Sequence, residues 1–224
     1  MPYLTLFTLI FSILSFPIHA DTKKTWNSDW AFEREEEGIS AECREHVSNI
    51  EQCRLTITVE ESLTALTAIN VDADNLANWM ANLISVEKLP KSKGLHDYFL
   101  YITYDFPGAY NRYSVNHSTI TQDETTKEVT LFFRTEKTKK KPKDLSLVKY
   151  ESITGYWKFR PLDSGKTKVI YSYLSLPNGH VQSVLYPFYN TSSLNASFET
   201  IKDMLKEIKK DKYQNAKLDF VVEG

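Results

Sequence analysis

The chain is poor in the residues that interrupt or cross-link a fold. Its 224 residues include only 7 glycines, 8 prolines and 2 cysteines, and none of these is concentrated in a linker. We find no low-complexity tract and no repeat with a period of roughly 20–50 residues. These absences exclude a repeat protein, and they favour a single domain because the 42% hydrophobic content is that of an ordinary globular protein.

A strong net charge and catalytic motifs are missing as well. The formal net charge is −2, whereas a protein that binds mainly nucleic acid needs a clearly basic face. The five histidines show no HExxH or HxH spacing, and there is no GxSxG elbow, GxGxxG motif or P-loop. We therefore expect no nucleic-acid partner, no resident metal, no cofactor and no enzymatic activity. One acid–base alternative stays open, namely His96 or His117 with Asp97 or Asp105.

Residues 1–20 contain no Asp, Glu, Lys or Arg and form an apolar run that ends in Pro-Ile-His-Ala. The small Ala20 suits a signal peptidase, so we expect a signal peptide over 1–20 and cleavage after Ala20. An uncleaved anchor is the alternative, because only the terminal amine supplies positive charge to the first residues. No other apolar segment reaches the roughly 18 residues of a membrane span. We expect the mature chain to be exported, to the periplasm or outside the cell.

Both cysteines lie beyond that cleavage point, and an even pair in an exported chain predicts a disulfide. Cys43 and Cys53 are nearly equidistant from a turn at Ser48-Asn49, so they are expected to face each other across an antiparallel hairpin. A redox or metal role is the alternative, and it would require further ligands nearby.

Hydrophobic periodicity predicts the remaining elements. Residues 25–37 are expected to form a first helix that ends at Gly38, followed by strands at about 39–47 and 52–59 and helical structure over 61–79. An antiparallel sheet of about eight strands is expected in total. Its later strands are expected at 84–89, 96–106, 112–122, 128–136, 147–162 and 166–176. A long amphipathic helix should follow and close the domain, because Leu194, Phe198, Ile201, Leu205 and Ile208 recur at helical spacing.

Several short motifs occur in a characteristic order along the chain. They are Glu37-Gly38-Ile39, Asn78-Trp79, the FPGAYNRY bend at 106–113, Gly155-Tyr156-Trp157, Pro161-Leu162 and Pro177-Asn178-Gly179. Their order and spacing resemble the START (StAR-related lipid-transfer) domain, in the manner of bacterial START-like proteins of the helix-grip, Bet v 1-like superfamily. The resemblance covers 26–210, so we expect a lipid-binding domain over 21–210 and a tail over 211–224. One departure concerns Asn111-Arg112-Tyr113, where the family often has Asp-Arg-Asp, and it leaves the ligand unassigned.

The resemblance implies an α+β helix-grip fold in which a curved antiparallel sheet wraps around the long C-terminal helix and leaves an internal hydrophobic tunnel. It also implies an exported lipid-binding or lipid-transfer protein that holds a lipid or a sterol-like molecule. The expected tunnel residues are Tyr98, Leu100, Ile102, Tyr104, Leu131, Phe133, Tyr171, Tyr173 and Phe198. The alternatives are plain core packing of these side chains, a cyclase-like or hydrolase-like enzyme of the superfamily, and a secreted interaction module whose cavity is filled by its own side chains.

Arg112 is expected to point into the tunnel, where its fork of donors would bind a headgroup, a hydroxyl or a carboxylate. An unpaired interior guanidinium is costly, so it must meet either a ligand or an internal acid. The nearby acids are Glu87, Asp97, Asp105 and Glu151. The alternative is an arginine paired at the surface of a strand.

A lysine-rich loop over 135–145 is the second candidate site. In the START layout it lies over the tunnel mouth, where a basic cluster attracts anionic lipid surfaces at about 1 kcal/mol per charge. We expect a monomer that makes transient contact with membranes, and a plain solvated turn is the alternative. The lysines are Lys137, Lys139, Lys140, Lys141 and Lys143.

Overall fold

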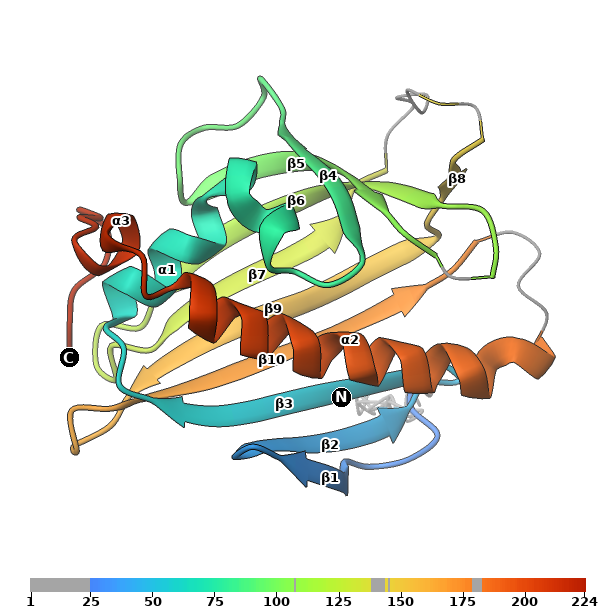
Figure 1. The fold of residues 1–224 in the computed structure, drawn as a ribbon, viewed down its shortest axis with the longest axis horizontal. Helices are drawn as coiled ribbons and strands as arrows, with labels where there is room; N and C mark the ends of the chain where they lie inside the picture. Colours follow the sequence, from blue (N-terminus) through green and yellow to red (C-terminus); the bar gives the residue numbers. More distant parts are fainter. Residues whose placement is uncertain (1–24, 107, 138–143, 145, 179–182) are drawn as a thin grey trace, which may run out of the picture.

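The computed structural model describes residues 25–106, 108–137, 144, 146–178 and 183–224, which form one open antiparallel sheet and a layer of helices (Figure 1). The strand order is β1-β2-β3-β10-β9-β7-β6-β5-β4, with β8 beside β6. The signal peptide expected over 1–20 lies outside the described residues. The strands are β1 (Ala31–Glu36), β2 (Ile39–Glu45), β3 (Glu51–Val59), β4 (Leu83–Lys88), β5 (Asp97–Tyr104), β6 (Arg112–Gln122), β7 (Val129–Thr135), β8 (Val148–Lys149), β9 (Ser152–Pro161) and β10 (Thr167–Leu176).

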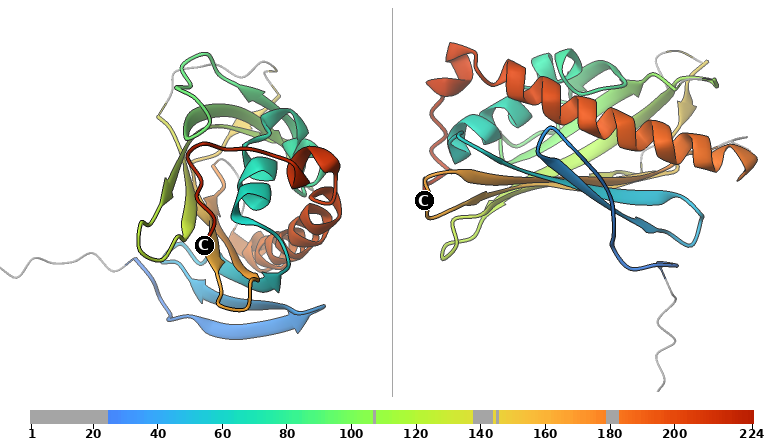
Figure 2. Two further views of the ribbon diagram at one scale, coloured as in Figure 1. Left: turned by 90° about the vertical axis from the view of Figure 1, so that its left-hand side faces the viewer. Right: turned by 60° about the horizontal axis from the view of Figure 1, so that its bottom comes forward.

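The sheet curves around the helices, as the end-on view of Figure 2 shows, so the expected helix-grip architecture is confirmed. The long helix α2 (Tyr186–Glu207) crosses the concave face, and α1 (Leu63–Val71) and η1 (Ala73–Asn78) cover it beside α2. The main core lies between these layers, where the residues expected on the apolar stripe of α2 are buried or packed against the core. No helix among the described residues is both long and apolar enough to span a membrane.

The expected helix over 25–37 is wrong, because this segment contains the edge strand β1. β1 and β2 form a hairpin in which Glu36 pairs with Ile39. The two turn residues, Glu37 and Gly38, have φ values of 52° and 78°, as a tight type I′ turn requires. A left-handed glycine is also common after a helix, so the same signal was assigned to the wrong element. Trp30 contacts arginines of the neighbouring strands instead of packing on a helix face.

The region expected as one strand over 147–162 is divided in two. β8 pairs with β6 in parallel, with Arg112 opposite Val148, and β9 begins at Ser152 after a break at Tyr150 and Glu151. Together with β1, this division gives ten strands where about eight were expected. The break matters for function because it turns Tyr150 into the interior beside Arg112.

The hairpin of β2 and β3 carries the disulfide. Cys43 and Cys53 are directly opposite each other in the register, and their sulfur atoms are bonded, as expected. Glu51 lies close to both sulfurs. Sulfurs joined in a disulfide are not thiolate ligands, so this group does not make a metal site.

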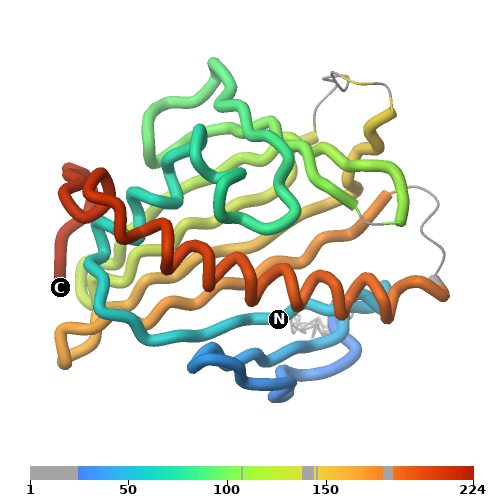
Figure 3. Tube along the Cα trace, viewed as in Figure 1, coloured from blue at the N-terminus to red at the C-terminus, as the bar shows by residue number. Residues whose placement is uncertain are grey.

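The C-terminal segment packs along the end of the sheet and beside the start of α1, as the tube of Figure 3 shows. The short helix α3 (Asp211–Gln214) places the buried Tyr213 against α1 and η1, where its hydroxyl donates to Asp72 at 2.8 Å. Farther along, Val222 exchanges two backbone-to-side-chain hydrogen bonds with Gln122. This segment therefore covers the end of the core that is opposite the start of α2.

Candidate ligand-binding cavity

A cavity of about 800 Å³ lies between the sheet and the helices. Its walls come from the concave faces of β5, β6, β7, β9 and β10, from η1 and from one face of α2. The side chains of the described residues leave this volume open, so an interior filled by the protein's own side chains is not what the structure has. The volume lies within the roughly 300–1,000 Å³ typical of small-molecule sites.

The structure brings together nearly all of the expected tunnel residues. Alternate residues of the strands face the cavity because side chains of a strand alternate between the two faces of a sheet. Phe198 is the exception, since it is buried but does not line the cavity. The guanidinium of Arg34 lies 4.3 Å from the centre of its ring, so β1 holds Phe198 on the far side of α2. The residues that do line the cavity are Tyr98, Leu100, Ile102, Tyr104, Arg112, Leu131, Phe133, Tyr171 and Tyr173.

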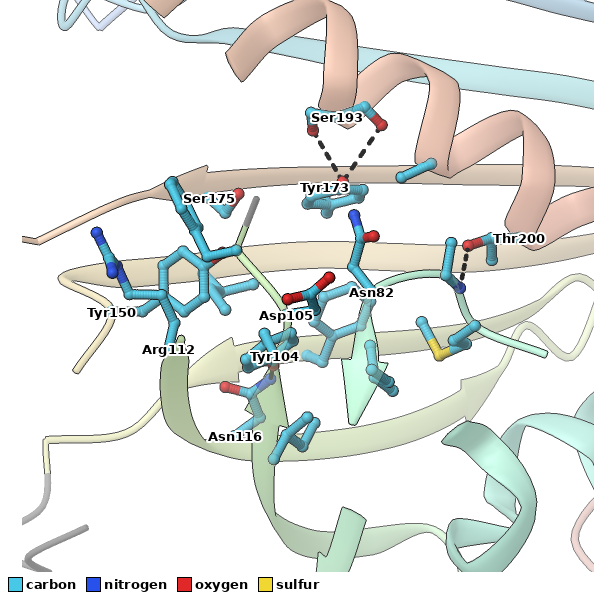
Figure 4. A pocket seen from close by; sticks show the side chains of 18 of the residues that line it. Asn82, Tyr104, Asp105, Arg112, Asn116, Tyr150, Tyr173, Ser175, Ser193 and Thr200 are labelled. Atoms are coloured by element: carbon cyan, nitrogen blue, oxygen red, sulfur yellow. Dashed lines mark hydrogen bonds between the residues drawn. The ribbon is translucent and has the colours of Figure 1, made fainter. Parts of the chain in front are cut away.

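Beyond the first turn of α2, the side chains that border the cavity are small and mostly polar. Ser192, Ser193, Ala196 and Thr200 line it, while the apolar stripe through Leu194 packs into the core. Figure 4 shows Ser193 facing Tyr173, whose hydroxyl lies 2.8 Å from the Ser193 hydroxyl. Small side chains at this face keep the helix wall thin, and they leave the space that larger residues would fill.

Arg112 lies inside, as expected, with 2% of its surface exposed. Its guanidinium lies over the ring of Phe106 at 4.3 Å and beside Tyr150 (Figure 4). Its one hydrogen bond among the described residues runs from Nη1 to the carbonyl of Tyr110, and its Nε has no partner there. Burial lowers the pKa of Arg112, and the phenols of Tyr150 and Tyr189 act in the opposite direction. Beyond the Tyr110 carbonyl, the guanidinium has no hydrogen-bond acceptor among the described residues.

No acid among the described residues forms an ion pair with Arg112, and carboxylates are not among the groups that shift its pKa. Asp97 instead accepts from His117 at 2.8 Å, and the exposed Asp105 lines the cavity near its rim. Of the two expected partners, a ligand or an internal acid, the acid is therefore not found among the described residues. The four acids considered were Glu87, Asp97, Asp105 and Glu151.

Most other polar groups of the wall bond to the protein itself. The Tyr104 hydroxyl bonds to Ser114 at 2.9 Å and accepts from Asn116 at 3.2 Å, and Thr135 donates to the Asn116 carbonyl. Burial raises the pKa of Tyr104 to about 12 although these hydrogen bonds lower it. The hydroxyl stays protonated at neutral pH, so this part of the wall is uncharged and already satisfied.

The cavity reaches the surface at one end. All exposed residues that line it, within the described chain, come from the turn before β4, the β5–β6 bend or the start of α2. Among them, Tyr110, Leu185 and Phe188 are large and expose 72%, 50% and 65% of their surface. We call this set the rim, and it consists of Asn82, Asp105, Gly108, Ala109, Tyr110, Leu185 and Phe188.

The histidine–aspartate pair considered as an acid–base alternative forms, but outside the cavity. His117 alternates with Asn116 and Ser118, which line the cavity, so its ring lies on the convex face of the sheet. There it stacks on Phe99 with ring centres 4.2 Å apart, and Nε2 contacts Asp97. His96 is exposed, and the centre of its ring lies 5.9 Å from that of Phe220.

Of the lysine cluster, the structure describes only Lys137, which is exposed just after β7. Lys139, Lys140, Lys141 and Lys143 lie outside the described residues. The chain re-enters the sheet at β8 beside Arg112, so the described flanks of this loop lead to the end of the sheet where the rim lies.

Sequence reasoning missed part of the cavity wall. The missed polar residues come from turns, breaks, helix faces and strand positions outside the predicted set. A usable signal existed on α2, where Tyr189, Ser193, Ala196 and Thr200 follow one another at helical spacing on the side away from the apolar stripe. The missed residues include Asn70, Asn82, Asn116, Tyr150, Ser175, Tyr189, Ser193 and Thr200.

Comparisons with known proteins agree with this architecture. No protein-family model and no curated protein sequence matches the chain. Among solved structures, a STAR-related lipid transfer protein from Xanthomonas axonopodis superposes with a TM-score of 0.71 at 20% identity, covering 81% of this chain and 99% of that one. Human StAR-related lipid transfer protein 5 superposes with a TM-score of 0.66 at 13% identity, covering 82% of this chain and 89% of that one.

An enzyme shares the architecture too. An aromatase/cyclase from Streptomyces sp. R1128 superposes with a TM-score of 0.50 at 15% identity, covering 70% of this chain and 93% of that one. At such identities a likeness establishes the fold and leaves the activity open. The chain therefore has the helix-grip fold of the START, or StAR-related lipid transfer, domains.

Proposed function

We propose that this protein binds one lipid or other hydrophobic small molecule in the cavity and carries it between membranes. The observation that supports this most directly is Arg112, a buried cation without an acidic partner among the described residues, at the edge of a largely apolar cavity. An amphiphile suits both features, because its chain buries apolar wall at about 25 cal/mol per Å² and its acidic head meets the guanidinium.

The position of Arg112 favours an acidic head over a neutral one. Desolvation of an unpaired guanidinium is costly, and a carboxylate or a phosphate accepts two of its donors at once. Phe106 and Tyr150 cover the guanidinium and exclude water from it, which strengthens such a contact. The ligand's head therefore stays near the rim and its apolar part extends under α2.

We favour a carrier over an enzyme for this cavity. An acid–base enzyme needs its titrating groups within reach of the bound molecule. The described histidine–aspartate pair, His117 with Asp97, lies on the opposite face of the sheet. The similarity to an aromatase/cyclase keeps the enzyme as the second candidate, and turnover of a polyketide-like or ester-like substrate would identify it.

Membrane contact at the rim is part of the proposal. The exposed Tyr110, Leu185 and Phe188 surround the opening, and interfacial aromatic and aliphatic side chains insert into the headgroup boundary of a bilayer. The lysines of 137–143 add attraction to anionic lipids. Docking at this end brings the opening against the membrane, so a ligand leaves the bilayer without crossing water.

We further propose that the chain acts after export. The apolar, uncharged segment 1–20 and the pairing of both cysteines fit an oxidising compartment outside the cytoplasm. A carrier there would move its ligand through an aqueous space between membranes or away from the cell surface.

Native mass spectrometry of the purified protein tests the carrier. We expect one molecule of amphiphile per chain, and weaker retention in both Arg112→Ala and Arg112→Lys, since lysine lacks the bidentate fork. Arg134→Ala is the matched control, because Arg134 is an exposed arginine on the convex side of β7. If the protein carries no lipid and takes none up from vesicles, the proposal is wrong.

A further inference from the structure

Two places in the cavity wall hold polar atoms that have no hydrogen-bond partner among the described residues. The first is the buried Nε of Arg112, whose Nη1 donates to the carbonyl of Tyr110. The second consists of the hydroxyl of Tyr171 and the side-chain carbonyl of Asn70, which form no hydrogen bond with the described residues. These two side chains are 4% and 3% exposed. Both residues line the cavity, so a bound molecule can supply the partner for each of these two polar groups.

The hydroxyl of Tyr171 is isolated by its own packing. Its ring stacks on Trp157 with centres 4.0 Å apart, and it is flanked by Tyr173. Two residues farther along β10, the Tyr173 hydroxyl bonds to Ser193, and two residues beyond that Ser175 bonds to Tyr189. Of the three cavity-facing residues on this strand, Tyr171 alone has no hydrogen-bond partner within the described part of the chain.

Asn70 comes to the same part of the cavity from the opposite wall. It lies in the last turn of α1, and its amide nitrogen donates to the carbonyl of Leu66 at 2.9 Å. α1 packs on β9 and β7, and Trp157 of β9 and Leu131 of β7 occupy the register row of Tyr171. The side-chain carbonyl of Asn70 and the hydroxyl of Tyr171 therefore both lie at the end of the cavity opposite the rim, which we call the deep end.

The length of β10 gives the approximate distance between the Arg112 end of the cavity and Tyr171. Ser175 and Tyr189 bond to each other, and Tyr189 lies close enough to Arg112 to affect its electrostatics. From Ser175 to Tyr171 the strand advances four residues, or roughly 13 Å. Between them the wall is mainly apolar, with Ile102 and Phe133. An extended chain of about ten to twelve carbons spans this distance.

The volume is large enough for a bound molecule. A cavity of about 800 Å³ lies within the roughly 300–1,000 Å³ typical of small-molecule sites, so a single-chain or fused-ring amphiphile fits inside it.

We propose that the cavity selects a single carboxylate-bearing amphiphile with a hydroxyl group at its far end, about ten to twelve carbons from the acid. Its carboxylate meets Arg112, and its hydroxyl donates to Asn70 and accepts from Tyr171. The inference rests on the proposed function and adds the class of ligand to it.

The difference in affinity between a fatty acid with a terminal hydroxyl and the same acid without it tests this inference. In a purely apolar deep end, a terminal hydroxyl would lose its water and weaken binding. With Tyr171 and Asn70 as partners, we expect delipidated protein to bind 12-hydroxydodecanoate about tenfold more tightly than dodecanoate in isothermal titration calorimetry. The isomer 3-hydroxydodecanoate, with its hydroxyl beside the acid, should show no such gain.

Two tyrosine-to-phenylalanine variants give the matched comparison. Tyr171→Phe keeps the stacked ring and removes the unpaired hydroxyl, so we expect the preference for 12-hydroxydodecanoate to disappear. Tyr156→Phe removes a hydroxyl from a β9 residue that does not line the cavity, so we expect the preference to remain. Circular dichroism and thermal unfolding check that both variants fold.

The possible outcomes distinguish the hydroxyl inference from the proposal that the protein carries a lipid. Equal or tighter binding of dodecanoate by the unchanged protein overturns the hydroxyl inference and leaves the lipid carrier standing. A preference that survives in Tyr171→Phe overturns it too. If neither acid binds, this inference is wrong, and the carrier is also wrong only when the purified protein contains no copurified lipid.

Discussion

The carboxylate of Glu223 accepts hydrogen bonds from the backbone amides of Leu63 and Thr64, at 3.0 and 2.8 Å. These amides open helix α1 and have no partner within the helix. Ser62 satisfies the amide of Ala65, so Glu223 completes the cap from the other end of the sequence. Helix α1, which covers the end of the cavity opposite the rim, is therefore held by the C-terminal segment.

We expect Glu223→Gln to lower the free energy of unfolding by about 1 kcal/mol, because it removes a negative charge from a helix N-terminus and weakens two charge-assisted bonds. Urea unfolding followed by circular dichroism measures this. Glu124→Gln, on an exposed turn, serves as the control and should change little. Equal stability of the two variants would contradict the role given to Glu223.

Glu128 should make stability depend on pH in the acid range. Burial raises its pKa, but hydrogen bonds from Lys158 at 3.0 Å and Arg160 at 2.6 Å outweigh this and leave the pKa below its ordinary value. A depressed folded-state pKa stabilises above the unfolded value of about 4.3, and the contribution is lost as the pH falls through the folded value. Glu128→Gln should therefore reduce stability at pH 7 and flatten the slope below about pH 5. Parallel stability curves for the two proteins would refute this.

The disulfide should stabilise the hairpin of β2 and β3. The two cysteines are 10 residues apart, and closing so short a loop contributes about 2–3 kcal/mol. A reducing agent should lower the urea midpoint of the unchanged protein and leave that of the double variant Cys43→Ser, Cys53→Ser unaffected. A midpoint that does not respond to reduction in the unchanged protein would contradict the expectation.

Gly155 is required by the close approach of its neighbours. A Cβ atom there would lie 2.5 Å from the Ser172 carbonyl oxygen and 2.6 Å from the ring of Phe133. We expect Gly155→Ala to destabilise the fold by about 1–3 kcal/mol and to reshape the cavity wall at Phe133. Thr154→Ala, one residue away on the other face of β9, is the control in the same thermal unfolding experiment. A loss no larger than that of the control would show that the strands separate easily here.

Membrane docking should depend on the rim. Phe188→Ser should reduce sedimentation with anionic vesicles, because Phe188 is large, exposed and next to the opening. Phe32→Ser removes an equally exposed ring, at 65%, from the distant edge strand β1, and it should not affect binding. Added salt should weaken binding as well, since the lysines act through charge. Equal losses in the two variants, or binding that is indifferent to salt, would argue against docking at this end.

The strands were predictable where one face is buried and the other is wet. Residues 152–159 of β9 alternate in this way, whereas β5 is largely buried on both faces. The cavity-facing Tyr98, Leu100, Tyr171 and Tyr173 were identified from their alternate positions in β5 and β10 together with the family resemblance. The first strand failed because β1 is an edge strand with little burial and therefore has no core-facing alternation. Its local glycine signal fits both a helix end and a tight turn.

The cavity side of α2 was not predictable from hydrophobicity. Its apolar stripe identifies the face that enters the core, so Phe198 was placed in the cavity. A ligand space needs the opposite, namely a face of small residues such as Ser193 and Ala196 that leaves room. The partners of Arg112 were also out of reach, because Tyr150 turns inward only through the break between β8 and β9.

Within the described residues, the exposed part of the cavity lining lies at the rim, and α1 with its C-terminal cap covers the opposite end. A ligand that enters such a cavity at the rim also leaves it at the rim. For a carrier, the same side of the molecule must therefore meet the donor and then the acceptor, and the protein must release the first before it turns to the second. Such a carrier contacts one membrane at a time and diffuses between the two, and it does not bind both membranes at once.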